Sequence, residues 1–122
     1  MAQGAGFVPG RHKIDDYGGG GFRFADMSHR GSVLATPGGV RAVDIEKAQD
    51  IDAAILDLAL ADGIDLMIIG SGVDLLPLAP TLRAQLRAAG VGCETMATGA
   101  AVRTYNLLVD EGRRVAALLI AV

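Results

Sequence analysis

The stretch Leu66-Met67-Ile68-Ile69-Gly70 decides the fold, because it is an unbroken apolar run that follows Asp65 and ends at a glycine. A short run without polar alternation is typical of a strand whose two faces are both covered, as in parallel sheets. The sequence therefore predicts a central strand with helices packed over it.

Apolar residues at helical spacing occur both before and after this run and predict a helix on each side of it. Before it, apolar residues recur at i, i+3, i+4 and i+7 and predict a helix over about 48–61 that ends before Gly63: Ile51, Ala54, Ile55 and Leu58. After it, Pro80 in a first turn and Gly90 as the stop predict a second helix with an inward stripe of Leu82, Leu86 and Ala89.

A third helix is predicted to begin at Thr98 as its N-cap and to stop at Gly112. Its inward stripe is Ala101, Tyr105 and Leu108. Short strands are predicted on either side of this helix, over 91–96 and 113–122. Strands and helices therefore alternate over 40–122, which indicates βαβ units in one sheet.

The first third of the chain is rich in glycine and reads as a β-hairpin layer. Ten of the 17 glycines lie in the first 40 residues. A weak strand is predicted over 12–17, and the alternation of Phe22, Arg23 and Phe24 indicates a second, half-buried strand. We expect a turn over 26–31, a return strand over 32–36, a turn at 37–39 and a strand over 40–45.

The predicted fold class is thus α/β. We expect a single three-layer domain over 11–122, with a central, mostly parallel mixed sheet, helices packed on it and an N-terminal β-hairpin layer. Residues 1–10 show no period, and we expect them to form a flexible N-terminus.

Composition excludes several classes of protein. The chain has 122 residues, a net charge of −3, one Cys and 2 His, so neither a zinc cage nor an intrachain disulfide is expected. The negative charge argues against a nucleic-acid partner. No apolar run approaches the roughly 20 residues of a membrane span, and the first residues do not resemble a secretory signal. We expect a cytoplasmic protein without a metal or other cofactor.

No complete catalytic constellation stands out in the sequence. Asp15 and Asp16 would face opposite ways on a strand, and Asp26 with His29 is a common turn pattern. Cys93 has no partner and is expected to be a small buried side chain. Arg83 and Arg87 mark the outer face of the second helix, which is either solvated or a partner surface. No catalytic residue is therefore assigned.

Two positions could form a small anion-binding pocket. Gly70-Ser71-Gly72 follows the buried strand, and Thr98-Gly99 opens a helix whose free N–H groups attract anions. Arg103 and Asn106 would add polar contacts. The alternative is structural: the first loop is a tight strand exit, and the small residues at the helix start allow close packing on the sheet.

Five segments in this order resemble one small family: Ile14-Asp15-Asp16-Tyr17-Gly18, Gly21-Phe22-Arg23-Phe24, Gly31-Ser32-Val33-Leu34, Ile68-Ile69-Gly70-Ser71-Gly72 and Thr98-Gly99-Ala100-Ala101-Val102-Arg103-Thr104-Tyr105-Asn106. The family is a domain of unknown function that bacterial and archaeal proteins share with the mitochondrial complex I assembly factor three and the adipogenesis-associated domain protein. Relatives often carry Trp where this chain has Val40-Arg41-Ala42-Val43.

The resemblance implies a three-layer fold with a central mixed sheet and no established catalytic residues. For the mitochondrial branch it implies protein–protein work during assembly of respiratory NADH dehydrogenase. Our first hypothesis is therefore a non-enzymatic interaction or assembly protein, whose partners would be respiratory-complex subunits or assembly factors. The second is a small-ligand binding protein or enzyme that uses the anion pocket. Self-association through an exposed apolar patch is a further expectation.

Overall fold

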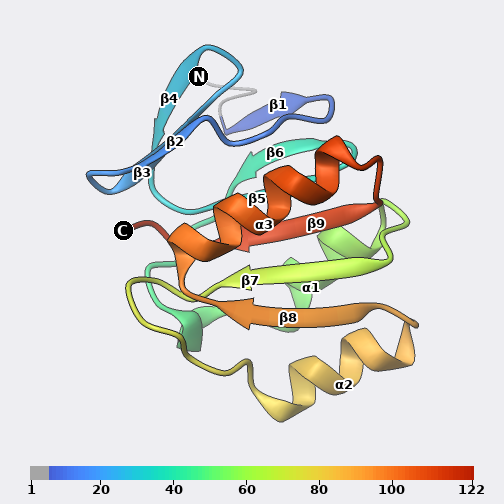
Figure 1. The fold of residues 1–122 in the computed structure, drawn as a ribbon. Coiled ribbons are helices and arrows are strands. Elements are labelled where there is room, and N and C mark those ends of the chain that lie inside the picture. The colour runs from blue at the N-terminus through green and yellow to red at the C-terminus, as the bar shows by residue number, and fades with distance from the viewer. Residues whose placement is uncertain (1–5) are drawn as a thin grey trace.

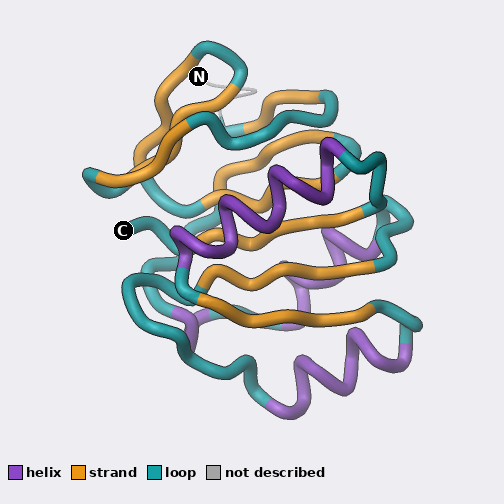
Figure 2. Tube along the Cα trace, viewed as in Figure 1, coloured by secondary structure: helices purple, strands orange, loops and turns teal. Residues whose placement is uncertain are grey.

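The computed structural model describes residues 6–122, and its strands form two sheets (Figures 1 and 2). The main sheet has the strand order β1 (Phe7–Pro9), β6 (Gly39–Ala42), β5 (Val33–Thr36), β9 (Val115–Leu119), β7 (Leu66–Gly70) and β8 (Gly92–Met96). The small sheet has the order β2 (Asp16–Gly18), β3 (Gly21–Phe24) and β4 (Met27–Arg30). Residues 1–5, which belong to the predicted flexible segment, lie outside the described residues.

Strand β7 is the parallel centre of the main sheet. It pairs in parallel with β8 on one side and β9 on the other, whereas β9–β5, β5–β6 and β6–β1 are antiparallel. The predicted mixed α/β sheet is confirmed, but it is less parallel than expected, because only the two pairs that β7 makes are parallel and the other three are antiparallel. Met67, Ile68 and Ile69 are at most 1% exposed, as the unbroken apolar run predicted.

Helices α1 (Ala53–Leu60) and α2 (Pro80–Ala88) cover one face of the main sheet, and α3 (Thr98–Asp110) with the small sheet covers the other. Figure 1 shows α3 in front of the sheet and α1 behind it, with α2 beside β8. One apolar core joins the sheet to α1 and α2 through Leu56 and Leu86. The other joins it to α3 and the small sheet through Tyr105, Phe22 and Phe24. Successive residues of β7 point into these two cores in turn.

The first helix differs from its prediction. Residues Ala48–Asp50 form a short 3-10 helix, and α1 begins only after Asp52, whose carboxylate accepts a hydrogen bond from the backbone N–H of Ile55 at 3.0 Å. Leu56 and Ala59 form its buried face, whereas Ala54 is exposed and Leu58 is 41% exposed, although both were expected inside. The N-cap hydrogen bond of Asp52 thus sets the start of α1, although the apolar spacing had predicted an earlier start.

The hairpin prediction was wrong in its pairing. Strand β3 turns back at Ala25 and Asp26, both at positive φ, and pairs with β4, where the sequence predicted a turn. The predicted return strand, β5, joins β6 and β9 in the main sheet instead. A two-residue turn with positive φ at both central positions normally uses Gly or Asn, so Ala25-Asp26 gives no sequence signal.

Smaller differences concern element ends and single side chains. Strand β1 was not predicted, β2 and β9 are shorter than expected, and β6 ends at Ala42. Ala97, not Thr98, occupies the N-cap of α3. Ala89 is exposed, and Leu108 and Cys93 are only partly buried. The helix stops are confirmed, because Gly90 and Gly112 adopt φ of +74° and +75°.

The N-terminal segment is held beneath α3 by polar contacts. The Asn106 side chain accepts from the Ile14 N–H at 2.8 Å and donates to the Ile14 carbonyl at 2.7 Å. Tyr105 donates its hydroxyl to the His12 carbonyl at 2.8 Å. Burial raises the pKa of Tyr105 to about 12, because an ionised phenol would lose its hydration inside the core.

This pKa predicts a loss of stability at high pH. The phenol ionises near pH 10 in the unfolded chain but about 12 in the folded one, so below pH 10 its contribution is constant. Between these values the unfolded state binds fewer protons, and the free energy of unfolding falls by about 1.4 kcal/mol per pH unit. Urea denaturation from pH 8 to 11.5 should show this loss in the wild type and not in Tyr105→Phe. Parallel curves for the two proteins would contradict it.

Candidate functional site

The carboxyl ends of β7, β8 and β9 meet at one edge of the main sheet, because these three strands are parallel. The loop Gly70-Ser71-Gly72 leaves β7 there, and α3 begins there after β8. The backbone N–H of Ser71 donates to the Met96 carbonyl at 2.9 Å, so the two segments are in direct contact. The structure thus brings together the two loops that the sequence placed in one pocket.

Thr98 connects these loops to each other. Its hydroxyl accepts from the Gly72 N–H at 3.0 Å and donates to the Ile120 carbonyl at 2.7 Å. Its own N–H donates to the Gly72 carbonyl at 2.8 Å. Thr98 is fully buried, and the three bonds tie the ends of β7 and β9 to the start of α3.

Ser71 makes a similar internal connection. Its hydroxyl donates to the Asp74 carbonyl at 2.7 Å and accepts from the Leu76 N–H at 2.9 Å, which folds the β7–α2 loop back on itself. The Gly72 and Thr98 N–H groups and the Ser71 hydroxyl, which would face an anion, therefore already have protein partners.

The glycines of the two loops allow close packing. A Cβ on Gly70 would lie 3.0 Å from the Ala101 Cβ and 3.1 Å from the Thr98 Cα. A Cβ on Gly99 would overlap the phenol of Tyr17. The small sheet therefore reaches over the N-terminus of α3 with one aromatic side chain.

Within residues 6–122, no side-chain hydrogen bond or ion pair joins Arg103 or Asn106 to the two loops. Arg103 is exposed on α3. Asn106 lies eight residues beyond Thr98, about 12 Å along the helix, and its amide is bonded to Ile14. Of the seven residues expected in the pocket, five come together: Gly70, Ser71, Gly72, Thr98 and Gly99. Asn106 does not join them, and Arg103 is exposed further along α3.

An exposed apolar loop lies at the same edge and was not predicted. Val73, Leu75 and Leu76 are 80%, 62% and 40% exposed, whereas Leu78 in the same loop is buried. The only sequence signal is the apolar composition of 73–78, which does not tell a buried segment from an exposed one. We call Val73, Leu75 and Leu76 the apolar loop.

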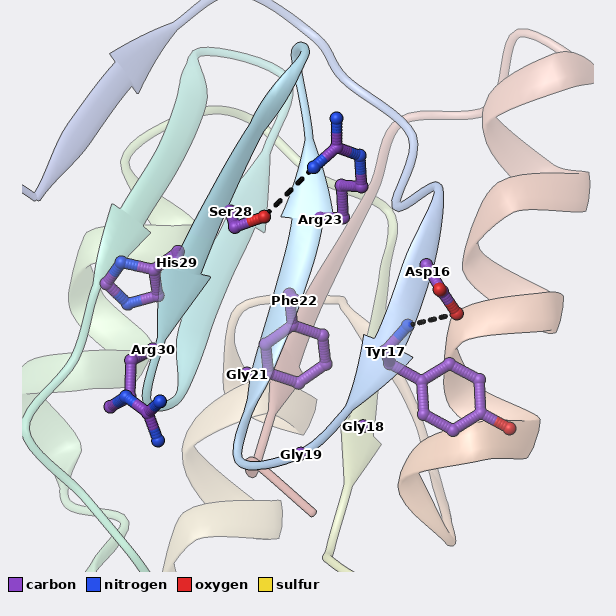
Figure 3. Close-up of a pocket in the computed structure, with 10 residues that line it drawn as sticks. All are labelled: Asp16, Tyr17, Gly18, Gly19, Gly21, Phe22, Arg23, Ser28, His29 and Arg30. Atoms are coloured by element: carbon purple, nitrogen blue, oxygen red, sulfur yellow. Dashed lines mark hydrogen bonds between the residues drawn. The ribbon is translucent and has the colours of Figure 1, made fainter.

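A second unpredicted feature is a hollow of about 650 Å³ on the small sheet (Figure 3). It is lined by the three strands and their connecting turn: Asp16, Tyr17, Gly18, Gly19, Gly21, Phe22, Arg23, Ser28, His29 and Arg30. The Arg23 guanidinium donates to the Ser28 hydroxyl at 3.0 Å. The absence of side chains at the glycines leaves the hollow open.

Three further observations concern metal binding, the single thiol and the helices of the described residues. Residues 6–122 hold no group of three or more His, Cys, Asp or Glu side chains that could bind a metal. Burial raises the pKa of the Cys93 thiol, which disfavours the nucleophilic thiolate. No helix within 6–122 has the length and apolar character needed to cross a membrane.

These features define a three-layer α/β domain built around a mixed sheet with a parallel centre. The chain belongs to the family of proteins of unknown function DUF498/DUF598, whose profile matches residues 14–120. The resemblance found from the five sequence segments is thereby confirmed.

Three similar proteins illustrate the family. An uncharacterised protein of Rhodobacter capsulatus is 40% identical over 116 residues, which cover 95% of this chain and 86% of that protein. A crystal structure of an outer membrane protein from Bartonella henselae is 48% identical with a TM-score of 0.88, covering 93% of this chain and 97% of its own. The NMR structure of the Rpa2829 protein from Rhodopseudomonas palustris is 44% identical with a TM-score of 0.82, covering 100% and 93%.

The geometry of Thr98 predicts a structural role that stability measurements can detect. Thr98→Val keeps the shape but removes the acceptor of the Gly72 N–H and the donor to Ile120. We expect a loss of about 1–3 kcal/mol in the free energy of unfolding in urea, because two buried backbone groups lose their partner. Thr81→Val, at an exposed position of α2, is the matched control and should change stability by about 0.5 kcal/mol or less. Equal effects in the two variants would contradict the role of Thr98.

Proposed function

We propose that the chain is a non-enzymatic interaction or assembly protein whose apolar loop contacts a partner protein. The observation that carries this proposal is the exposure of Val73, Leu75 and Leu76 in one short loop. Burying one such side chain against a partner is worth about 1.5–3 kcal/mol. Exposed apolar residues that gather in one place mark interaction sites more often than scattered ones.

The structure of the loop supports a binding role. The Ser71 hydroxyl bonds to Asp74 and Leu76 hold the loop in a defined shape, and Thr98 holds its base against β9 and α3. A loop that is ordered before binding loses less conformational entropy when it binds. The apolar side chains are thus presented on a rigid support.

The identity of the partner is a finer proposal that rests on the family resemblance. We propose that the partner is a subunit or an assembly factor of respiratory NADH dehydrogenase, as the mitochondrial relatives imply, and that this chain acts in the cytoplasm. Fold-level analogy with those relatives supports this assignment.

The apolar loop generates a direct test. Val73→Asp with Leu75→Asp should leave the circular dichroism spectrum unchanged, because both side chains are exposed, and should abolish capture of the partner from an extract of the native cell. Leu107→Asp is the matched control, since Leu107 is 59% exposed on α3, away from the loop. It should capture the same proteins as the wild type.

Three outcomes count against the proposal or its parts. If the double variant captures what the wild type captures, the apolar loop is not the contact. If mass spectrometry finds no respiratory-complex subunit or assembly protein among the captured proteins, the proposal that the partner belongs to respiratory NADH dehydrogenase is wrong. If light scattering shows a homo-oligomer that the double variant dissociates, the loop binds a second copy of the chain and not a different partner.

The second candidate function is a small-anion site at the Gly70-Ser71-Gly72 loop and the Thr98-Gly99 helix start, with Arg103 as a further contact. Its support is the meeting of the two loops at one sheet edge. The internal hydrogen bonds of Thr98 and Ser71 count against it, because an anion would have to replace them.

A thermal-shift panel of nucleotides, phosphates and carboxylates tests this second function. A ligand at 100 times its Kd should add about 2.7 kcal/mol of stability, which raises the Tm by several degrees. The shift should be smaller in Arg103→Ala. No shift across the panel, or an equal shift in the variant, would leave the apolar loop as the better candidate.

A further inference from the structure

The outer face of the small sheet carries two arginines on diagonal positions. Arg23 lies opposite Ser28 in the register of β3 and β4, and Arg30 lies opposite Gly21, two residues further along β4. Side chains at directly opposite positions share one face, and so do residues two apart on a strand. Phe22, next to Arg23 in sequence, is buried in the core, so Arg23 points to the solvent side, and Arg30 shares that face.

The two guanidinium groups have unused hydrogen-bonding capacity. Within residues 6–122, ion pairs join Lys13 to Asp110 and Arg114 to Asp65, and neither includes Arg23 or Arg30. Each guanidinium has five N–H donors, and within the described part of the chain their one side-chain hydrogen bond runs from Arg23 to Ser28. Both guanidinium groups can therefore still donate hydrogen bonds to an acidic ligand.

The shape of the hollow favours an extended ligand over a small ion. The hollow crosses all three strands, and glycines at 18, 19 and 21 leave its floor without side chains. Figure 3 shows the two guanidinium groups pointing toward opposite ends of the strands, and a Cβ on Gly20 would lie 3.6 Å from Nη1 of Arg30. With the guanidinium groups in these orientations, two acidic side chains spaced along a peptide match the two arginines better than a single carboxylate does.

The local charge is opposite to that of the whole molecule. The hollow holds Arg23 and Arg30 against a single carboxylate, Asp16, so its formal charge is +1 (two cations minus one anion), whereas the chain as a whole carries −3. Asp16 already accepts a hydrogen bond from the Tyr17 N–H at 2.9 Å. An acidic segment would thus be attracted to this face by the two arginines.

We propose that this face binds an extended, carboxylate-rich segment of a partner protein, with Arg23 and Arg30 each pairing with one acidic side chain. The inference rests on the proposed interaction function and names the chemistry of the partner at a second surface, away from the apolar loop. Arginine suits this task because its planar fork pairs with carboxylates through two hydrogen bonds.

A peptide titration followed by ¹H–¹⁵N correlation NMR tests the proposal on the whole chain. The probe is hexaglutamate, with hexaglutamine as the uncharged control. We expect hexaglutamate alone to shift the amide signals of residues 16–23 and 28–30. The Kd should rise roughly tenfold in the double variant Arg23→Gln, Arg30→Gln, since two exposed ion pairs are lost. Arg83→Gln with Arg87→Gln, on the exposed face of α2, is the matched control and should bind like the wild type.

Several results would overturn the proposal: no shifts with hexaglutamate, equal shifts with hexaglutamine, or equal Kd values in the two arginine double variants. Citrate that shifts the same amides with the same Kd would replace the acidic segment by a small carboxylate. Failure here is distinguishable from failure of the proposed function. Loss of partner capture in the Val73 and Leu75 variant, together with no hexaglutamate binding, would retain the interaction function and reject only the acidic segment.

Discussion

The covering of β7 on both faces is the constraint on which the rest of the structure depends. Met67 and Ile69 point into the core with α1 and α2, and Ile68 points into the core with α3 and the small sheet. Elements from distant parts of the chain must cover each face, because both faces of β7 are apolar and are buried away from water. The three layers follow from that requirement, and so does the meeting of the parallel strand ends at one edge.

The sequence predicted those features that depend on neighbouring residues. The apolar run of β7 and the alternation of Phe22, Arg23 and Phe24 appear in the structure as expected. The features that depend on distant partners were not predictable. The hydroxyl of Thr98 was expected to cap its own helix, but it bonds to Ile120, which lies 22 residues away. The turn at Ala25 and Asp26 contains no glycine or asparagine, the residues that normally indicate such a turn in a sequence.

The candidate surfaces show the same limit. Leu75 and Leu78 are the same residue type in one loop, yet one is 62% exposed and the other is buried. Composition cannot separate them, because their environment is set by the path of the loop past α2. Arg23 and Arg30 likewise become neighbours only through the pairing of β3 with β4, which the predicted hairpin did not contain. The five loop residues that did come together were predicted from the parallel topology alone.

The two hydrogen bonds between the Asn106 side chain and the Ile14 backbone affect how the chain folds during synthesis. The two residues are 92 positions apart, and Tyr105 and His12 are 93 apart. On the ribosome, the N-terminal strands must therefore wait, with Phe22 and Phe24 exposed, until α3 has emerged. Chains whose contacts are this distant in sequence fold slowly. Newly made copies thus pass through a period in which a chaperone can bind them, and a truncation within α3 would leave the small sheet without its anchor.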